Sequence, residues 1–298
     1  MTIGIVGLGR MGLSIAWRLR QAGHTVIGFD FSPEACAQAQ EIGVDVVDTV
    51  ATVAQKARIL WLMVPQGQPV DDVLSSCKQN FQAGDIVIDG GNSYFRDSIR
   101  RHTELAKLQI FFIDCGTSGG LHGRDLGYCL MVGGDEHVYK KLIPLFQVIS
   151  APDGYAYMGP SGTGHYVKMV HNGIEYALLE SYAEGFHMLK EGEFKNLDLE
   201  KISHVWQNGS IVRSWLLNLA HEIFKQDQNF EKISGSIGEN KTGQWTVDEA
   251  HQEHIPVPMI EKALAIRAWS RESGGNYATK LVALLRHQFG GHPVKKLN

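Results

Sequence analysis

The chain opens with a short apolar run that leads directly into three closely spaced glycines. Thr2–Val6 is rich in β-branched residues, and a GxGxxG pattern follows it before a helical pattern over Leu13–Leu19. Glycines at this spacing permit a tight turn, and the N-terminus of the next helix can receive a pyrophosphate. The context of strand, turn and helix predicts a dinucleotide-binding unit rather than a simple βα turn. Backbone contacts to the cofactor are assigned to Gly7, Leu8, Gly9, Arg10, Met11 and Gly12.

An acidic residue indicates which dinucleotide is bound. The next predicted strand, Thr25–Phe29, ends at Asp30, about 20 residues into the unit, where the ribose-binding acid of such folds stands. A carboxylate there accepts hydrogen bonds from the adenosine ribose and repels a 2′-phosphate. No lysine or arginine follows within residues 31–34. The sequence therefore predicts NAD and disfavours NADP.

Strand and helix patterns continue to alternate along the first half of the chain. Further strands are predicted at Val44–Val47, Ile59–Val64, Asp85–Asp89, Gln109–Asp114 and Gly127–Val132, and a closing helix at Glu136–Ile149. This repetition predicts a Rossmann-type doubly wound α/β sheet, with residues 1–160 as the dinucleotide-binding domain.

Ligands of a doubly wound sheet bind beyond the carboxyl ends of its strands. The loops Met63–Gln66, Asp89–Ser93 and Asp114–Gly120 are expected there, although each could be an ordinary tight turn. Met63, Val64 and Asn92 are accordingly assigned to the cofactor.

After residue 160 the pattern becomes helical throughout. An opening helix is predicted to about Leu189, followed by helices at Leu199–Trp206, Ser210–Phe224, Thr246–His254, Pro258–Arg271 and Lys280–Phe289. Residues 161–298 are therefore expected to form an all-α domain for substrate binding and dimerisation, ending in a tail. The opening helix, about 40 Å long at 1.5 Å per residue, is long enough to be the spine of a domain or subunit.

One face of the opening helix carries an unusual set of polar side chains. At 3.6 residues per turn the following residues share a stripe: Lys168, His171, Asn172, Glu175 and Tyr176. The other faces are apolar, with residues such as Ile174 and Leu178, which predicts a helix buried among neighbours. A buried stripe of this kind is costly unless its groups serve each other or a ligand. A solvated face with weak ion pairs is the alternative, and Gly173 favours the site because a glycine within a helix often marks a close approach.

The overall composition excludes several classes of partner. The net charge is −4, and lysine and arginine occur in no run longer than a pair, so neither a nucleic acid nor an anionic membrane is expected as partner. The apolar N-terminal run lacks a preceding basic segment and is interrupted by Arg10. Four cysteines without a CxxC spacing suit free thiols in a reducing cytoplasm, and no metal site is expected.

These motifs together resemble the decarboxylating 6-phosphogluconate dehydrogenases over essentially the whole chain. The resemblance is carried by Gly7–Gly12, Asp89–Ser93, Ser118–Gly120 and Lys168–Tyr176. The length is similar to that of the short, NAD-preferring form. The resemblance implies oxidative decarboxylation of 6-phospho-D-gluconate to ribulose 5-phosphate and CO2 with reduction of NAD, a reaction of the pentose phosphate pathway and of gluconate utilization.

The family pattern also implies catalytic roles. Lys168 matches the base that takes the hydroxyl proton as hydride leaves, which requires a pKa lowered by burial or by a nearby positive charge. Glu175 matches the acid that protonates C1 of the enediol. The two residues are two helical turns apart, about 10 Å, and can reach opposite ends of a three-carbon reacting unit.

The resemblance implies a substrate site as well. Matches to residues that contact the substrate outside its phosphate are Asn92, Ser118, Gly119, Gly120, His171 and Asn172. Matches to phosphate ligands are Tyr176, Arg267 and, displaced by one position, Lys241. Arg286 and His292 match a tail that completes the neighbouring subunit's site, which implies a homodimer or homotetramer. A frayed C-terminus is the alternative for the tail.

Two other functions remain as alternatives. A non-decarboxylating 3-hydroxyacid dehydrogenase, such as one for 3-hydroxyisobutyrate, would share the fold and Lys168 but would have no use for the phosphate residues. A catalytically silent NAD-binding regulator would not be expected to keep both Lys168 and Glu175.

Overall fold

The computed structural model describes residues 1–297 and consists of two units, Met1–Met169 and Val170–Asn298. Asn298, the last residue of the predicted helical domain, lies outside the described residues. The division falls inside helix α8 (Thr163–Glu191) rather than at the predicted boundary near residue 160, because the first turns of α8 pack on the sheet of the first unit.

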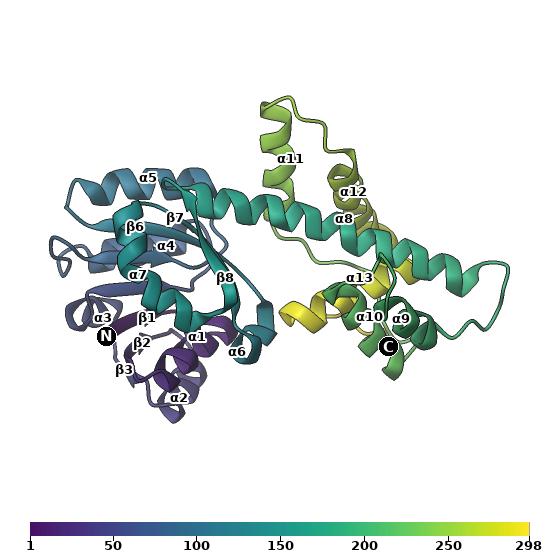
Figure 1. Cartoon of the computed structure of the whole chain (residues 1–298), viewed down its shortest axis with the longest axis horizontal. Helices are drawn as coiled ribbons and strands as arrows, with labels where there is room; N and C mark the ends of the chain where they lie inside the picture. The colour runs from purple at the N-terminus through teal and green to yellow at the C-terminus, as the bar shows by residue number, and fades with distance from the viewer. Residues whose placement is uncertain (298) are drawn as a thin grey trace. The chain divides into compact units, whose positions relative to one another are not determined.

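The first unit is built on one eight-stranded sheet (Figure 1). The strands are β1 (Thr2–Val6), β2 (Thr25–Phe29), β3 (Asp45–Val46), β4 (Ile59–Leu62), β5 (Ile86–Asp89), β6 (Phe111–Ser118), β7 (Tyr128–Gly133) and β8 (Ser150–Gly159). Their order is β3-β2-β1-β4-β5-β6-β7-β8, and neighbours are parallel except β6 and β7. The crossover from β3 back past β1 to β4 gives the doubly wound topology, so the predicted fold class is confirmed.

Helices cover both faces of this sheet. They are α1 (Arg10–Gln21), α2 (Pro33–Glu41), α3 (Val50–Lys56), α4 (Gln68–Cys77), α5 (Phe95–Ala106), the short η1 (Gly120–His122) and α6 (Gly123–Leu126), and α7 (Glu136–Ile149). Successive side chains of a strand point to opposite faces, so Trp61 enters one buried cluster while Leu60 and Leu62 enter the other. Two separate apolar cores therefore hold the helices to the sheet.

Two differences from the predicted strands affect the site. β6 continues to Ser118 because its last residues pair with antiparallel β7, from Cys115 opposite Val132 to Ser118 opposite Cys129. Most of the predicted loop at Asp114–Gly120 is therefore strand. β8 was not predicted, since this edge strand contains Pro152, Asp153 and Gly154 and pairs with β7 in an irregular register.

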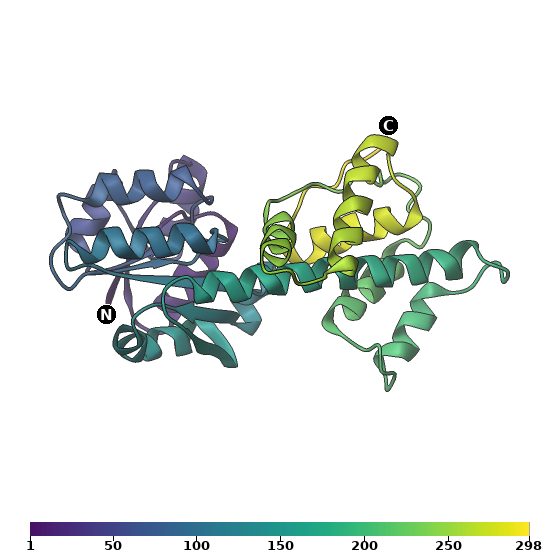
Figure 2. The same ribbon diagram turned by 90° about the horizontal axis from the view of Figure 1, so that it is seen from above.

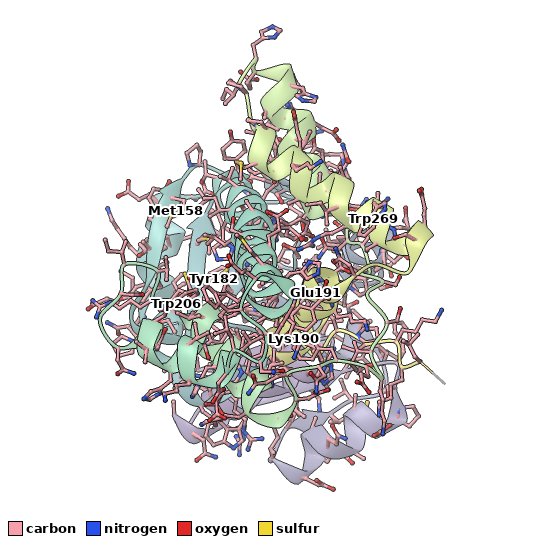
Figure 3. All side chains as sticks on the ribbon, turned by 90° about the vertical axis from the view of Figure 1, so that its right-hand side faces the viewer. Met158, Tyr182, Lys190, Glu191, Trp206 and Trp269 are labelled. Atoms are coloured by element: carbon pink, nitrogen blue, oxygen red, sulfur yellow. The ribbon has the colours of Figure 1, made fainter. Side chains whose placement is uncertain are left out.

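The second unit is helical. Besides the C-terminal part of α8 it contains α9 (Leu199–Gln207), α10 (Trp215–Gln226), α11 (Thr242–Gln252), α12 (Pro258–Ser273) and α13 (Tyr277–Gly290). Leu179 and Phe186 of α8 share one core with α9, α10 and α13, and Figure 2 shows these helices gathered around α8. Trp206 of α9 packs on Phe186 with ring centroids 5.5 Å apart, and Figure 3 shows it on a different side of α8 from Trp269.

Helix α10 begins at Trp215 rather than at the predicted Ser210, because Ser214 caps it by accepting a hydrogen bond from Leu217 N at 3.0 Å. Ile174 and Leu178 of α8 are 53% and 45% exposed, so the prediction that these apolar positions are buried is wrong for the single chain. Periodicity defined the apolar face but not whether a neighbour covers it. Within residues 1–297, every helix is too short or too polar to cross a membrane.

Candidate active site

The glycine turn after β1 has the form that a pyrophosphate requires. Gly7 has φ +94°, and a Cβ there would lie 2.5 Å from the Met63 carbonyl oxygen. Gly12 approaches the Gly7 carbonyl too closely to carry a side chain. At Gly9, which begins α1 without a side-chain cap, a Cβ would meet open space. Helix N–H groups facing open space beside a bare backbone fit an anionic pyrophosphate.

Asp30 lies at the end of β2, where the sequence placed the ribose acid. Its Oδ2 accepts a hydrogen bond from Leu8 N at 2.6 Å, and its Oδ1 accepts one from Ser32 N at 2.8 Å. Each carboxylate oxygen can accept a further bond. The carboxylate is therefore held against the glycine turn while it keeps capacity for two ribose hydroxyls.

The loops that follow β4 and β5 lie against each other. A Cβ on Gly91 would be 3.1 Å from the Val64 carbonyl oxygen, and Gly90 N donates to Leu62 O at 3.0 Å. The buried Asp89 carboxylate accepts from Gly91 N at 3.1 Å and from Ser93 Oγ at 2.7 Å. The structure thus brings together two of the loops predicted to contact the cofactor, with Asn92 between the two residues bound by Asp89.

Asp114 fixes the beginning of the helix that carries Lys168. Its Oδ1 accepts from Gly162 N at 2.7 Å and its Oδ2 from His165 N at 2.9 Å. This buried carboxylate satisfies N–H groups at the positive end of the α8 dipole. Asp114 was predicted at the end of a strand and the start of a loop, and its capping role was missed because its partners are about fifty residues away along the chain.

Lys168 is seated directly on β6. It is 7% exposed, and a Cβ on Gly116 would overlap the Lys168 Cβ and lie 2.8 Å from the Gly164 carbonyl oxygen. Gly116 therefore sets the distance between the strand and the first turns of α8. The neighbouring Cys115 is fully buried, and burial raises the pKa of its thiol, which argues against oxidant sensitivity there.

The remaining residues of the first unit that were predicted to bind substrate lie at and just after the end of β6. Ser118 is the last residue of the strand and is partly buried. Gly119 and Gly120 have φ values of +128° and +54°, conformations that favour glycine. The backbone therefore turns away from β6 at the two predicted glycines.

In the second unit the polar stripe of α8 continues as predicted. Asn172 and Tyr176 are buried, His171 and Glu175 are partly buried, and His171 Nδ1 lies 3.1 Å from Asn172 Oδ1. A Cβ on Gly173 would be 2.8 Å from Thr246 Cγ2 and 3.0 Å from Ile260 Cδ1. Gly173 thus marks the close approach of α11 and α12, as expected.

Tyr176 lies under a buried arginine. The Arg267 Cζ is 3.3 Å from the centre of the Tyr176 ring, and Arg267 is 2% exposed. Within residues 1–297, none of its three side-chain nitrogens makes a hydrogen bond, and its Nε lies 3.8 Å from Glu180 Oε1. Burial lowers the pKa of Arg267 and raises that of Glu180 to about 7. A buried guanidinium with unused donors fits an anionic ligand.

Arg286 adds a second cation to this cluster. It is 6% exposed, and burial, followed by the positive charge of Arg267, lowers its pKa to about 10. Both arginines belong to the same chain. The expectation that Arg286 serves a neighbouring subunit stays a prediction.

The displaced lysine is not part of the Tyr176 contacts. Lys241 is exposed just before α11, whereas Asn240 Oδ1 accepts hydrogen bonds from the Tyr176 hydroxyl and, at 2.6 Å, from Thr242 Oγ1. Neither Asn240 nor Glu180 was predicted as a site residue from the sequence. The position of Glu180, four residues after Tyr176 on the same helical face, was a signal for it.

His292 lies beyond the end of α13. Its carbonyl oxygen is 2.9 Å from His287 Nδ1, and its ring meets that of Phe289 edge to face at 6.3 Å. The tail then pairs with the same chain, since Ser234 N donates to Lys295 O at 2.9 Å. Among the described residues 1–297 no cluster of histidine, cysteine and acidic side chains is arranged to hold a metal.

Comparison with known proteins assigns both units. Residues 2–165 match the family model of the NAD binding domain of 6-phosphogluconate dehydrogenase, and residues 164–293 match that of the 6-phosphogluconate dehydrogenase C-terminal domain. A relative from Haloferax volcanii, named 6-phosphogluconate dehydrogenase, NAD(+)-dependent, decarboxylating, is 43% identical over 99% of both chains.

Solved structures agree in fold. The 6-phosphogluconate dehydrogenase of Plasmodium falciparum is 30% identical with a TM-score of 0.81, covering 91% of this chain and 62% of that one. The 3-hydroxyisobutyrate dehydrogenase of Mycobacterium tuberculosis has a TM-score of 0.76 at 21% identity, covering 96% and 98% of the two chains. At that identity the second likeness shows the fold alone.

Proposed function

Because the chain belongs to the 6-phosphogluconate dehydrogenase family, we propose that it oxidises and decarboxylates 6-phospho-D-gluconate to ribulose 5-phosphate and CO2 while reducing NAD. The observation that carries the proposal is the buried pair Arg267 and Arg286 beside Tyr176. Glu180 offers these two guanidinium groups one buried carboxylate, and burial raises the pKa of that carboxyl to about 7. A bound phosphate would add two negative charges and several hydrogen-bond acceptors for the unused donors of Arg267.

The cofactor site supports NAD. The open face at Gly9 would receive the pyrophosphate, and the carboxylate of Asp30 would accept the ribose hydroxyls and repel a 2′-phosphate. Bound NAD supplies the hydride acceptor. No metal is required by the chemistry assigned to the residues of this chain.

Lys168 and Glu175 carry the proton transfers. The neutral amine of Lys168 takes the proton of the C3 hydroxyl while C3 loses its hydrogen as a hydride. The product of this oxidation is a 3-keto acid. The Lys168 ammonium then returns this proton to the carbonyl oxygen, so that the electrons of the breaking C1–C2 bond are accepted as CO2 leaves. Glu175, two turns further along α8, protonates the terminal carbon of the resulting enediol. Lys168, again a neutral amine, takes back the proton of the neighbouring enol hydroxyl as this carbonyl re-forms, which gives the ketose.

The other predicted substrate residues would bind parts of the substrate that do not react. Asn92, Ser118, Gly119, Gly120, His171 and Asn172 are proposed to bind the remainder of the sugar acid. Lys241 is exposed at the start of α11, and its part in binding phosphate is a proposal. We also infer a cytoplasmic homodimer or homotetramer in which His292 of the tail helps to complete a neighbouring site, consistent with the exposed Ile174 and Leu178. Arg286 is buried beside Arg267 of its own chain and is assigned here to the phosphate cluster of that chain.

The test measures the initial reduction of NAD and NADP by the purified protein with 6-phosphogluconate, gluconate and 3-hydroxyisobutyrate, with CO2 assayed in parallel. We expect NAD reduction and one CO2 per NADH with 6-phosphogluconate only. Reduction by 3-hydroxyisobutyrate without CO2 would assign the protein to the non-decarboxylating dehydrogenases. A protein that binds NAD but oxidises none of the three would be the silent regulator.

Variants of the two proton-transfer residues separate their roles. Lys168→Met removes the base and is expected to lower kcat by roughly 100-fold or more, the usual contribution of general acid–base catalysis. Glu175→Gln keeps the shape of the side chain and should slow product formation while NAD affinity is retained. Loss of NAD affinity in either variant would argue for a structural role instead.

A further inference from the structure

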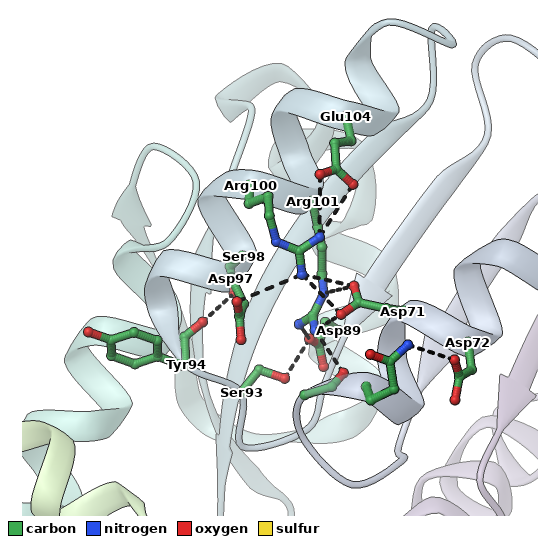
Figure 4. Close-up of polar contacts among 12 residues, drawn as sticks. Asp71, Asp72, Asp89, Ser93, Tyr94, Asp97, Ser98, Arg100, Arg101 and Glu104 are labelled. Atoms are coloured by element: carbon green, nitrogen blue, oxygen red, sulfur yellow. Dashed lines mark hydrogen bonds and ion pairs between the residues drawn. The ribbon is translucent and has the colours of Figure 1, made fainter.

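Two consecutive arginines of α5 differ in their surroundings although they bind the same carboxylate. Arg100 and Arg101 both donate to Asp71 of α4, as Figure 4 shows. The Arg100 side chain is 43% exposed and also meets Glu104 on its own helix. The Arg101 side chain is fully buried. The chain therefore offers a matched pair of residues, one at the surface and one inside the unit.

The Arg101 guanidinium touches groups from two loops. Its Nε and Nη2 donate to the Asp71 oxygens at 2.8 and 3.1 Å, and Nη2 also donates to the Gly67 carbonyl oxygen at 2.9 Å. Its Nη1 lies 3.5 Å from Oδ2 of the equally buried Asp89. Gly67 ends the loop that follows β4, and Asp89 is the last residue of β5, immediately before the loop that follows this strand.

Asp89 extends this contact to the residues around Asn92. Its Oδ1 accepts from Gly91 N and its Oδ2 from Ser93 Oγ, so both neighbours of Asn92 are bound to a carboxylate that faces Arg101. On the other side, Gly67 follows the segment that contains Met63 and Val64. The planar Arg101 guanidinium, whose N–H donors have a fixed geometry, thus joins the loop after β4 to the loop after β5.

Stability alone is a weak reason for this arrangement. Burial by itself would raise the pKa of Asp71, but hydrogen bonds from Arg101 and Arg100 outweigh it and lower the pKa. The exposed Arg100 shares in this benefit, so the pKa of Asp71 does not explain why Arg101 is buried. Desolvating a guanidinium is costly, and buried ion pairs are often replaced by apolar residues without loss of stability. The Nη1 atom also lacks a hydrogen bond within residues 1–297. We therefore attribute the burial of the Arg101 guanidinium to the fixed spacing that it imposes on the loops after β4 and β5.

We propose that Arg101 is a positioning residue for the NAD site, which holds the loops after β4 and β5 at a fixed separation. It thereby presets the backbone of Met63 and Val64 and the side chain of Asn92 for the cofactor. The inference rests on the proposed function only in taking NAD as the ligand.

The test compares Arg101→Lys with Arg100→Lys in the full-length protein. Each variant keeps its positive charge and loses the paired hydrogen bonds to Asp71, but only Arg101→Lys also loses the Gly67 and Asp89 contacts. Isothermal titration calorimetry gives the Kd of NAD, and steady-state kinetics gives KM and kcat. We expect roughly a tenfold rise in the Kd and KM of NAD for Arg101→Lys, typical of a lost hydrogen bond to a charged group, and less than a twofold rise for Arg100→Lys. Equal effects of the two variants, or an unchanged Kd in folded Arg101→Lys, would overturn the proposal.

A second variant keeps the proposal testable if Arg101→Lys does not fold. Ser93→Ala removes the Ser93 bond to the Asp89 carboxylate but leaves Arg101 and its contacts to Asp71 and Gly67 in place, and we expect a rise of about threefold in the Kd of NAD. A purely structural role would lower the melting temperature of Ser93→Ala and leave this Kd unchanged, which would refute the inference. Failure of the proposed function would be distinguishable, because wild-type protein would then bind NAD without oxidising 6-phosphogluconate.

Discussion

Replacing Glu180 by glutamine should make the protein more stable, by an amount that grows with pH. Glu180 is 5% exposed, and neither carboxylate oxygen makes a hydrogen bond within residues 1–297. The charged groups that face it are Arg267 on α12, Glu184 on α8 and Arg286 on α13. Burial raises its pKa to about 7, although the arginines act in the opposite direction.

The expected change in the free energy of unfolding depends on two opposing effects, the attraction between Glu180 and Arg267 and the cost of burying their charges. At 3.8 Å and an effective dielectric constant of about 20, the attraction between Glu180 and Arg267 is about 4 kcal/mol. Burial costs several kcal/mol for each ion, and it lowers the pKa of Arg267 as well, so burial outweighs the attraction on both sides of the pair. A carboxyl pKa of about 7 against an ordinary 4.5 corresponds to about 3 kcal/mol.

Proton binding by Glu180 decides whether its carboxyl stabilises or destabilises the fold at a given pH. Between pH 4.5 and 7 the folded protein holds the Glu180 proton more tightly than the unfolded chain, so this carboxyl favours folding at low pH. That contribution is lost as the pH rises through 7. Glutamine resembles the protonated acid at every pH, so the variant and the wild type should be equally stable near pH 4.5 and should differ by about 3 kcal/mol at pH 8.

Differential scanning fluorimetry at pH 5, 6, 7 and 8, in a phosphate-free buffer and at one protein concentration, measures this trend. We expect the melting temperature of Glu180→Gln to exceed that of the wild type by about 5 °C at pH 8 and by little at pH 5. Glu272→Gln, an exposed carboxyl on α12 that does not face Glu180, is the control and should shift by less than about 1 °C. A Glu180→Gln protein that melts below the wild type at pH 8 would refute the reasoning and show that the ion pair stabilises the fold.

Three further predictions concern the active site. Gly116→Ala places a methyl group against Lys168 and should lower kcat at least tenfold, whereas Gly185→Ala, whose methyl group would meet open space, should leave kcat unchanged. Equal activities of the two variants would contradict the inference that close packing of α8 on β6 positions Lys168. Asp30→Ala should raise the KM for NAD and reduce the preference for NAD over NADP, and an unchanged preference would refute the ribose assignment. Arg267→Lys should raise the KM for the phosphorylated sugar acid at least tenfold with little effect on NAD, and a parallel rise for both would count against a phosphate site.

Local sequence patterns determined the architecture and supplied the predicted centre of the site. The GxGxxG turn, Asp30 and the polar stripe of α8 are all short-range signals, because strand and helix periodicity place neighbouring residues on a common face. They were sufficient for the fold class and the family, both of which are confirmed. Gly173 was likewise correctly read as a point of close approach.

Tertiary structure decided which residues support that site. Asp114 caps α8, Arg101 joins two loops and Glu180 faces Arg267, and each of these contacts joins segments that are distant in the sequence. The extension of β6 depended on antiparallel β7, and the exposure of Leu178 depended on which elements cover α8. The periodicity of one segment reports which face is apolar or charged. It contains no information about the partner that the folded chain brings to that face, and the free energy of a buried charge depends on that partner.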